Sequence, residues 1–137
     1  MSSLSWSEVF AVHRARRGIG ERSLLVDRGE SGYKNRFLPD GRIVYMGEGK
    51  RGHQEPLGGN LRLLRAYAEG KALRVFLREK PGIWQNLGLY RVVGVSYGLL
   101  PEEGRYVYWF TLEPGGCEAA PSGSGLRPPR QRKGRDL

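Results

Sequence analysis

The sequence has little of what metal centres, disulfide scaffolds and membrane spans require. It contains one cysteine, Cys117, and two histidines among 137 residues, so neither an internal disulfide nor a multi-thiolate metal site can form. No apolar run approaches the roughly 20 residues of a membrane-spanning helix, and the N-terminus lacks the basic and apolar segments of a signal peptide. We therefore expect a cytoplasmic protein with no membrane partner, no metal and no other cofactor.

Acidic residues are also scarce relative to basic ones. The 23 Lys and Arg outnumber the 14 Asp and Glu, which gives a formal net charge of +9. A balance of this kind favours a polyanionic partner, most often nucleic acid, although a basic surface without a partner has the same composition. The hydrophobic content of 39% fits one domain with a single core.

Two short helices are predicted. Ser5 and Glu8 have the spacing of a capping box, and arginines suited to a helix C-terminus follow before a glycine, which predicts a helix over residues 6–17. Asn60 is suited to cap a second helix over residues 61–69, which has one apolar flank and ends at a glycine.

Apolar and β-branched runs between turn residues predict more strand than helix. The expected strands cover residues 23–26, 42–46, 73–78, 89–93 and 105–112. The Pro-Glu-Glu-Gly stretch at 101–104 is a hairpin-like connection into the last strand. This pattern predicts an α+β domain on a curved, barrel-like, mainly antiparallel sheet with two short helices.

The composition changes at Gly115. Residues 115–137 are rich in Gly, Pro and Ser and carry five basic residues against two acidic ones. Such a segment cannot bury enough apolar surface to fold alone. We therefore predict one domain over residues 1–114 and a basic disordered tail over 115–137, which adds nonspecific attraction to phosphate.

Three glycines after the second predicted strand, Gly47, Gly49 and Gly52, match the G-x-G-x-x-G pattern. A dinucleotide-binding loop requires a helix that starts at the last glycine, but the next predicted helix begins only near residue 60. The pattern is therefore interpreted as a tight strand exit.

The case for an enzyme rests on His53, which lies near Glu48 and Glu55. This grouping suggests a small metal-dependent nuclease, but a metal cluster needs two or three converging ligands. His13 lies among apolar helix neighbours and is expected to be structural. A binding module is the favoured prediction, with the nuclease as an alternative.

Five blocks in chain order resemble the SET- and RING-associated (SRA, or YDG) domain, a family with a PUA-like barrel that reads modified cytosine in DNA. The resembling blocks are 45–49 (YMGEG), 59–64 (GNLRLL), 70–76 (GKALRVF), 88–93 (GLYRVV) and 106–113 (YVYWFTLE). The resemblance implies base flipping, in which a base leaves the stack and is held between flat groups. It implies double-stranded DNA with a modified base as partner, and a restriction or modification-sensing system with a possible partner nuclease.

The resemblance suggests Tyr33 and Tyr45 as the aromatic sandwich, because they correspond to the two tyrosines of the family. Ordinary packing tyrosines are the alternative interpretation. Where the family has an acidic residue after the first tyrosine, this chain has Asn35 and Arg36, and Asp40 is the nearby carboxylate. These three residues complete the predicted base pocket, and the base specificity stays open.

In the family, a loop after the second tyrosine enters the duplex. The resemblance therefore implies that His53 or Gln54 faces the orphaned base, while Lys50 and Arg51 meet phosphate; Arg74 is assigned to the same DNA-facing set. Two further alternatives are an RNA-binding PUA-like domain of the pseudouridine-synthase kind and a module that binds another protein.

Overall fold

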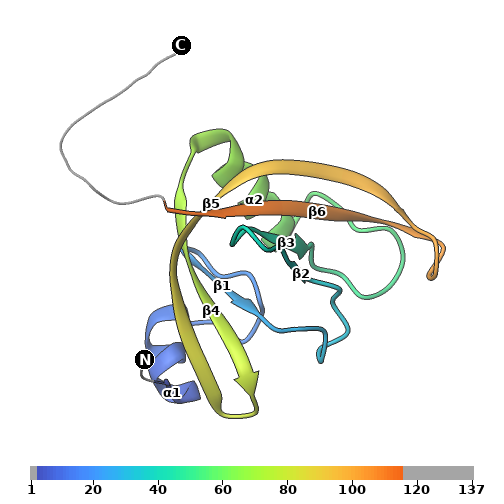
Figure 1. Cartoon of the computed structure of the whole chain (residues 1–137). Helices are drawn as coiled ribbons and strands as arrows, with labels where there is room; N and C mark the ends of the chain where they lie inside the picture. Colours follow the sequence, from blue (N-terminus) through green and yellow to red (C-terminus); the bar gives the residue numbers. More distant parts are fainter. Residues whose placement is uncertain (1–2, 116–137) are drawn as a thin grey trace.

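The computed structural model describes residues 3–115 as two helices and one six-stranded sheet (Figure 1). The elements are α1 (Trp6–His13), β1 (Ser23–Val26), β2 (Arg36–Phe37), β3 (Ile43–Met46), α2 (Gly58–Glu69), β4 (Ala72–Lys80), β5 (Ile83–Leu100) and β6 (Arg105–Pro114). The strand order is β1-β4-β5-β6-β3-β2. The predicted α+β class with a curved, mainly antiparallel sheet is confirmed. Cys117 and the predicted tail beyond Gly115 lie outside the described residues.

The sheet is mixed and curls into a half-barrel. β1 pairs with β4 in parallel, and the other neighbouring strands pair antiparallel. β5 continues for 18 residues, far beyond the predicted 89–93. Register shifts interrupt its ladders with β4 and β6, and Gly88 adopts a φ of 94° at the first of them. Such bulges bend a strand without ending it, and Figure 1 shows β5 arched against β6.

Helix α1 begins as predicted and ends early. The backbone N–H of Ser5 donates to Glu8 Oε1 (2.8 Å) and the N–H of Glu8 donates to Ser5 Oγ (3.2 Å), which is the predicted capping box. Arg14 adopts the left-handed conformation with a φ of 58° and donates its N–H to the Phe10 carbonyl (2.8 Å). The helix therefore stops at His13, and the predicted continuation to residue 17 is wrong.

Helix α2 begins before its predicted cap. The helix starts at Gly58 with Leu57 as the N-cap and no side-chain cap hydrogen bond. Asn60 lies in the first turn, 1% exposed, where its side chain bonds the preceding loop instead of capping the helix. Gly70 ends the helix in the left-handed conformation, as predicted.

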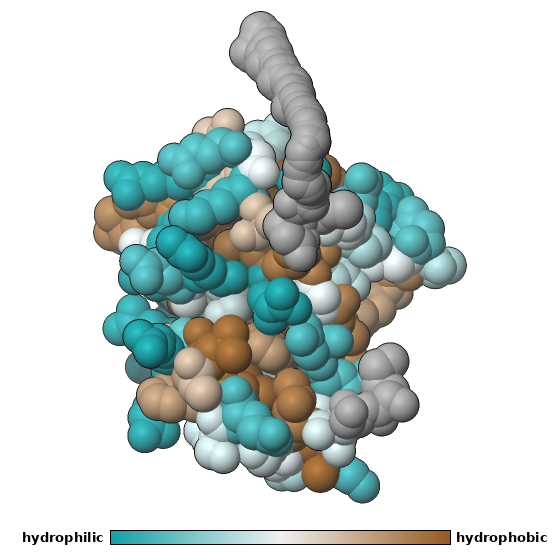
Figure 2. Space-filling view, turned by 90° about the vertical axis from the view of Figure 1, so that its left-hand side faces the viewer, coloured by the Kyte–Doolittle hydropathy of each residue, from teal (hydrophilic) through white to brown (hydrophobic). Residues whose placement is uncertain are grey.

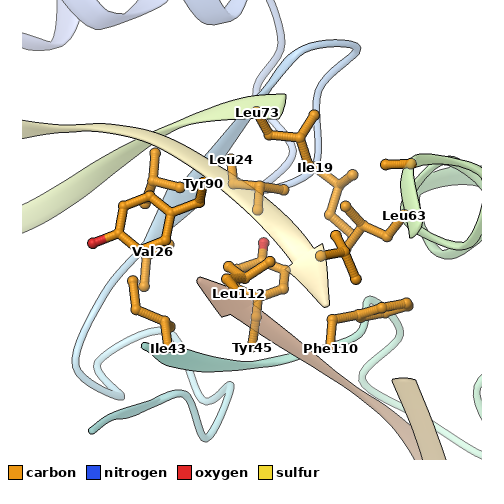
Figure 3. Close-up of a cluster of buried hydrophobic side chains, with 13 residues drawn as sticks. Ile19, Leu24, Val26, Ile43, Tyr45, Leu63, Leu73, Tyr90, Phe110 and Leu112 are labelled. Atoms are coloured by element: carbon orange, nitrogen blue, oxygen red, sulfur yellow. The ribbon is translucent and has the colours of Figure 1, made fainter. Parts of the chain in front are cut away.

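The main core lies between the concave face of the sheet and α2. Figure 3 shows Leu63 of α2 and side chains of β1, β3, β4, β5 and β6 converging around Leu112 and Tyr45. A second cluster of Val9, Phe76 and Trp84 lies beneath α1. Figure 2 shows one face of the molecule, on which hydrophilic side chains surround smaller hydrophobic areas. Within residues 3–115, neither helix is long and apolar enough to cross a membrane.

Candidate nucleic-acid interface

The curl of the sheet brings β1 close to β3, although these strands lie near opposite ends of the strand order. The Tyr45 hydroxyl on β3 donates to the Leu25 carbonyl on β1 (3.3 Å). Asn35 bridges the same gap, because its Nδ2 donates to the Asp27 carbonyl (3.4 Å) and its Oδ1 accepts from the Met46 N–H (2.9 Å). We call this junction between β1 and β3 the seam.

A cavity of about 690 Å³ opens along the seam, within the range of roughly 300–1,000 Å³ typical of ligand sites. Tyr33, Tyr45 and Asn35, three of the five predicted pocket residues, line it together. The other lining residues are Trp6, Arg16, Arg17, Gly18, Ile19, Leu25, Val26, Asp27, Ser31, Met46, Glu48, Gly49, Arg78, Gly82 and Trp84. We call it the seam cavity.

Tyr45 belongs to the core and to the cavity wall at once. Its side chain is 6% exposed and packs in the main cluster, and a Cβ at Gly18 would approach its hydroxyl oxygen to 2.8 Å. Burial strongly raises the pKa of Tyr45, and the charges of Tyr33, Glu48 and Asp27 raise this pKa further. The hydroxyl therefore stays protonated and acts as a donor.

Two contacts from the loop that follows β3 hold the Tyr33 side chain in place. The backbone N–H of Gly49 donates to the Tyr33 hydroxyl (3.2 Å), and Lys50 Nζ lies 5.5 Å from the ring centroid, within the range of a cation–π contact. Gly32 precedes Tyr33 with a φ of 96°, a conformation that favours glycine. Tyr33 is half-buried, so its ring is positioned and still accessible.

Asp27 is a buried acceptor that the sequence did not single out. It is 8% exposed, and its two carboxylate oxygens accept from the backbone N–H groups of Gly29 (2.9 Å) and Ser31 (3.2 Å). Each oxygen keeps further acceptor capacity. The Asp-x-Gly pattern directly after a strand was a signal for this turn, but not for its place in the cavity.

The structure does not bring Arg36 and Asp40 to the cavity, which corrects the prediction that they join the pocket. Arg36 lies on the exposed strand β2, and Asp40 pairs with Arg42 in an exposed turn (2.8 Å). Hydrogen bonding to the Arg42 backbone N–H lowers the pKa of the Asp40 carboxyl. Both predictions followed sequence distance from Tyr33, whereas the cavity is closed by β1.

The prediction that Gln54 faces DNA is wrong. Its side chain is buried and holds the surrounding backbone together, as an internal brace. It is 3% exposed, and its Nε2 donates to the carbonyls of Gly47 (2.7 Å) and Gly49 (3.0 Å). Its Oε1 accepts from the Tyr108 N–H (2.8 Å). A side chain with all these partners cannot also enter a duplex.

The other predicted loop residues lie toward solvent. Lys50, Arg51 and His53 are exposed, but His53 Nδ1 already accepts from the Tyr106 N–H (3.0 Å). Arg74 does not line the seam cavity, and its Nη1 donates to Asn86 Oδ1 on β5 (3.2 Å). Arg74 therefore lies on β4, outside the loop between β3 and α2, and its predicted contact with phosphate stays a prediction.

Two buried side chains, Arg105 and Asn60, fix the loop between β3 and α2. The sequence indicated Asn60 only as a helix cap and Arg105 only as a strand residue. Arg105 Nη1 donates to the carbonyls of Gly49 (2.8 Å) and Gly52 (3.0 Å). Asn60 Oδ1 accepts from the Glu48 N–H (2.8 Å), and its Nδ2 donates to the carbonyls of Glu48 and Glu55 (3.0 Å each). The loop is thus tied to β6 and to α2.

The proposed nuclease ligands do not converge. Glu48 Oε2 accepts from the Gly59 N–H (2.9 Å), and His53 is bonded to β6. No group of three or more His, Cys, Asp or Glu side chains suited to a metal ion occurs within residues 3–115. The ligand set on which the nuclease alternative rested is therefore not assembled in this part of the chain.

Comparisons with known proteins agree with this geometry. A family model described as "ScoMcrA-like, SRA domain" matches residues 18–114, and no curated protein sequence matches the chain. The SRA domain of SUVH5 in complex with fully methylated CG DNA is 24% identical with a TM-score of 0.68, covering 81% of this chain and 85% of that chain.

Two further solved structures have the same fold. SUVH5 SRA bound to fully hydroxymethylated CG DNA is 23% identical with a TM-score of 0.69, covering 88% of this chain and 91% of that chain. The modification-dependent TagI restriction endonuclease is 22% identical with a TM-score of 0.70, covering 84% of this chain but 49% of that chain. At these identities, the structural matches establish a shared fold.

Proposed function

The chain belongs to the ScoMcrA-like family of SRA domains, and on that premise we propose that it recognises a modified base in double-stranded DNA by receiving the flipped base in the seam cavity. One observation carries the proposal: Tyr33 and Tyr45 line a single cavity of about 690 Å³. The SUVH5 complexes with methylated and hydroxymethylated DNA, and the modification dependence of TagI, support DNA as the ligand.

Stacking supplies the affinity for the flipped base. Taking a base out of the duplex costs a few kcal/mol, and each base–aromatic stack contributes about 1–3 kcal/mol. Tyr33 is the adjustable partner because its ring is half-buried and held through its hydroxyl. Tyr45 is the fixed partner because the core packs around it.

Asp27 supplies a carboxylate acceptor on the wall of the seam cavity, which Asp40 does not reach. The exocyclic amino group of cytosine is a donor, and the Asp27 carboxylate retains acceptor capacity beyond its two backbone hydrogen bonds. The backbone bonds fix its direction before the base arrives. We assign amino-group recognition to Asp27, which takes the role first sought at Asn35, Arg36 and Asp40.

The test compares binding to a duplex with one 5-methylcytosine and to the same duplex without it. We expect Tyr33→Ala to lower affinity for the modified duplex by about fivefold to 150-fold, the equivalent of one stack of about 1–3 kcal/mol. Tyr33→Phe, which keeps the ring, is the matched control and should retain most of the preference. A 2-aminopurine beside the target base should gain fluorescence on binding.

Equal affinity of the wild-type protein for a panel of duplexes with and without modified bases would contradict the proposal. Competition with structured RNA separates it from an RNA-binding PUA-like domain, since RNA would then displace the duplex. The chain aligns with about half of TagI, so we assign recognition to it and cleavage to a partner nuclease. Cleavage of modified DNA by this chain alone with Mg²⁺ or Mn²⁺ would overturn that assignment.

A further inference from the structure

The segment between α1 and β1, residues 14–22, is rich in arginine. Its first four residues, 14–17, lie just upstream of the matched family region, which begins at Gly18. Arg16 and Arg17 of this segment line the seam cavity. They also line a second hollow of about 370 Å³, whose other lining residues are Ala15, Ile19, Glu48, Gly58, Gly59 and Arg62. The two hollows are therefore neighbours that share the same arginine wall.

The backbone of this segment is anchored on β1. His13 Nε2 lies 2.7 Å from the Arg17 carbonyl oxygen and must donate to it, because a carbonyl can only accept. In the neutral imidazole the other nitrogen, Nδ1, then accepts from the Ser23 hydroxyl (2.6 Å). The Leu25 N–H donates to the Gly18 carbonyl (2.8 Å). Because these bonds fix the backbone beneath the arginines, a ligand bound there has less chain entropy to overcome.

The smaller hollow carries a surplus of positive charge. Arg16, Arg17 and Arg62 face one carboxylate, that of Glu48, which already accepts from the Gly59 N–H. Within residues 3–115, none of the three arginines takes part in a salt bridge, and all three are exposed. Guanidinium groups in this state are suited to bidentate binding of phosphate.

We propose that this smaller hollow binds a backbone phosphate of duplex DNA, next to the nucleotide whose base enters the seam cavity, with Arg16, Arg17 and Arg62 as donors. The proposal rests on the proposed function for the identity of the polyanion. It follows from the shared wall, because a base in the larger cavity brings its own sugar–phosphate to the arginines that border both hollows.

The experiment measures Kd for a 5-methylcytosine duplex and its unmodified counterpart from about 50 to 200 mM salt, a range over which phosphate contacts change affinity strongly. The variants are the double substitution Arg16→Gln with Arg17→Gln, and the single substitution Arg62→Gln. Arg14→Gln is the control, since Arg14 lies in the same segment as Arg16 and Arg17 but lines neither hollow. It removes one positive charge, as Arg62→Gln does, and the effect of the double variant is compared with it per charge removed.

We expect both affinities to fall by the same factor, and the slope of log K against log salt to lose about 0.9 for each phosphate contact removed. The control should change neither slope nor affinity to a comparable degree. Thermal melting of each variant verifies that it is folded. If the double variant is unstable, Arg62→Gln, on the exposed face of α2, still tests the phosphate site.

Two results would overturn the phosphate assignment. One is a loss of preference for the modified base with an unchanged salt slope, which would make the arginines readers of the base. The other is a response no larger than that of Arg14→Gln. Failure of the proposed function is distinct: the wild-type protein would then bind both duplexes equally, while the slopes on unmodified DNA would still decide the phosphate site.

Discussion

At the scale of single residues, His13 is a buried titratable group that supports the arginine segment. It is 3% exposed and bonded to Ser23 and Arg17. Burial lowers the pKa of His13 from its ordinary value of 6.5, and the hydrogen bond to the Arg17 carbonyl offsets part of this. The folded protein therefore holds this imidazole neutral at pH values where the unfolded chain protonates it.

This difference predicts a pH-dependent stability. As the pH falls below about 6.5, the unfolded chain binds a proton at this imidazole that the folded chain does not bind. The free energy of unfolding therefore decreases, by at most about 1.4 kcal/mol per pH unit, until the pH reaches the lowered pKa of the folded state. Above that pH the contribution is fully present. Urea unfolding of the wild type and His13→Gln at a series of pH values measures the difference.

The variant should be less stable at neutral pH and should lose less stability on acidification. Parallel curves for the two proteins would show that His13 does not titrate in the way its burial implies. The carboxylates cancel in this comparison, because both proteins carry the same set.

Residues also differ in how far the sequence could predict their roles. Tyr33 and Tyr45 were identified through resemblance, and the structure places both on one cavity. Asp27 was not identified, because its position in the cavity depends on β1 meeting β3, two segments that are distant in the strand order. Gln54 was misassigned because its loop position suggested exposure, whereas its amide satisfies three backbone groups.

At the scale of elements, side-chain hydrogen bonds hold the loop between β3 and α2, in addition to two backbone hydrogen bonds from Gly47 and Gln54 to β6. Gln54→Ala leaves the Gly47 carbonyl and the Tyr108 N–H without these partners, and it removes one of the two hydrogen bonds to the Gly49 carbonyl, which keeps Arg105 as a donor. Each unsatisfied buried group costs about 1–3 kcal/mol. We expect a loss of about 2–4 kcal/mol in the free energy of unfolding, together with weaker binding to modified and unmodified DNA.

Arg51→Ala is the matched control in the same loop. Its exposed side chain should affect binding, while the free energy of unfolding should stay within about 0.5 kcal/mol of the wild type. Denaturant unfolding and Kd measured on both variants distinguish the two roles. A Gln54→Ala protein as stable as Arg51→Ala would refute the role of Gln54 as a brace.

The elements themselves were predicted where local signals were strong. The capping box began α1 and glycine ended α2, since both depend on nearby backbone groups. β5 was predicted too short because the prediction covered only the β-branched and aromatic run 89–93, whereas the strand extends in both directions and passes through a bulge at Gly88. The two-residue strand β2 has no periodic signal, because only its pairing with β3 defines it.

At the scale of the whole molecule, the net charge of +9 is distributed over the domain and the C-terminal segment. Residues 116–137 carry five basic and two acidic residues, a net of +3, so charge alone predicts that they strengthen binding to any duplex. A protein ending at Gly115 should bind with a smaller salt slope and the same ratio of affinities for modified and unmodified DNA.

Fluorescence anisotropy with the full chain and the shortened chain at several salt concentrations measures both quantities. A change in the ratio would assign the C-terminal segment a part in base recognition, contrary to this prediction. Thermal melting of both chains provides the control for folding.

The seam also determines how far β1 and β3 can move apart. One hydrogen bond, from Tyr45, joins β3 directly to β1, and Asn35 bridges Met46 of β3 to Asp27, which follows β1. The backbone ladder connects the two strands only through β4, β5 and β6. β1 and β3 can therefore separate when these hydrogen bonds break, while the backbone pairing within the sheet stays intact. The bending stiffness of the sheet, rather than the loss of pairing between strands, would then set how large a base the seam cavity admits.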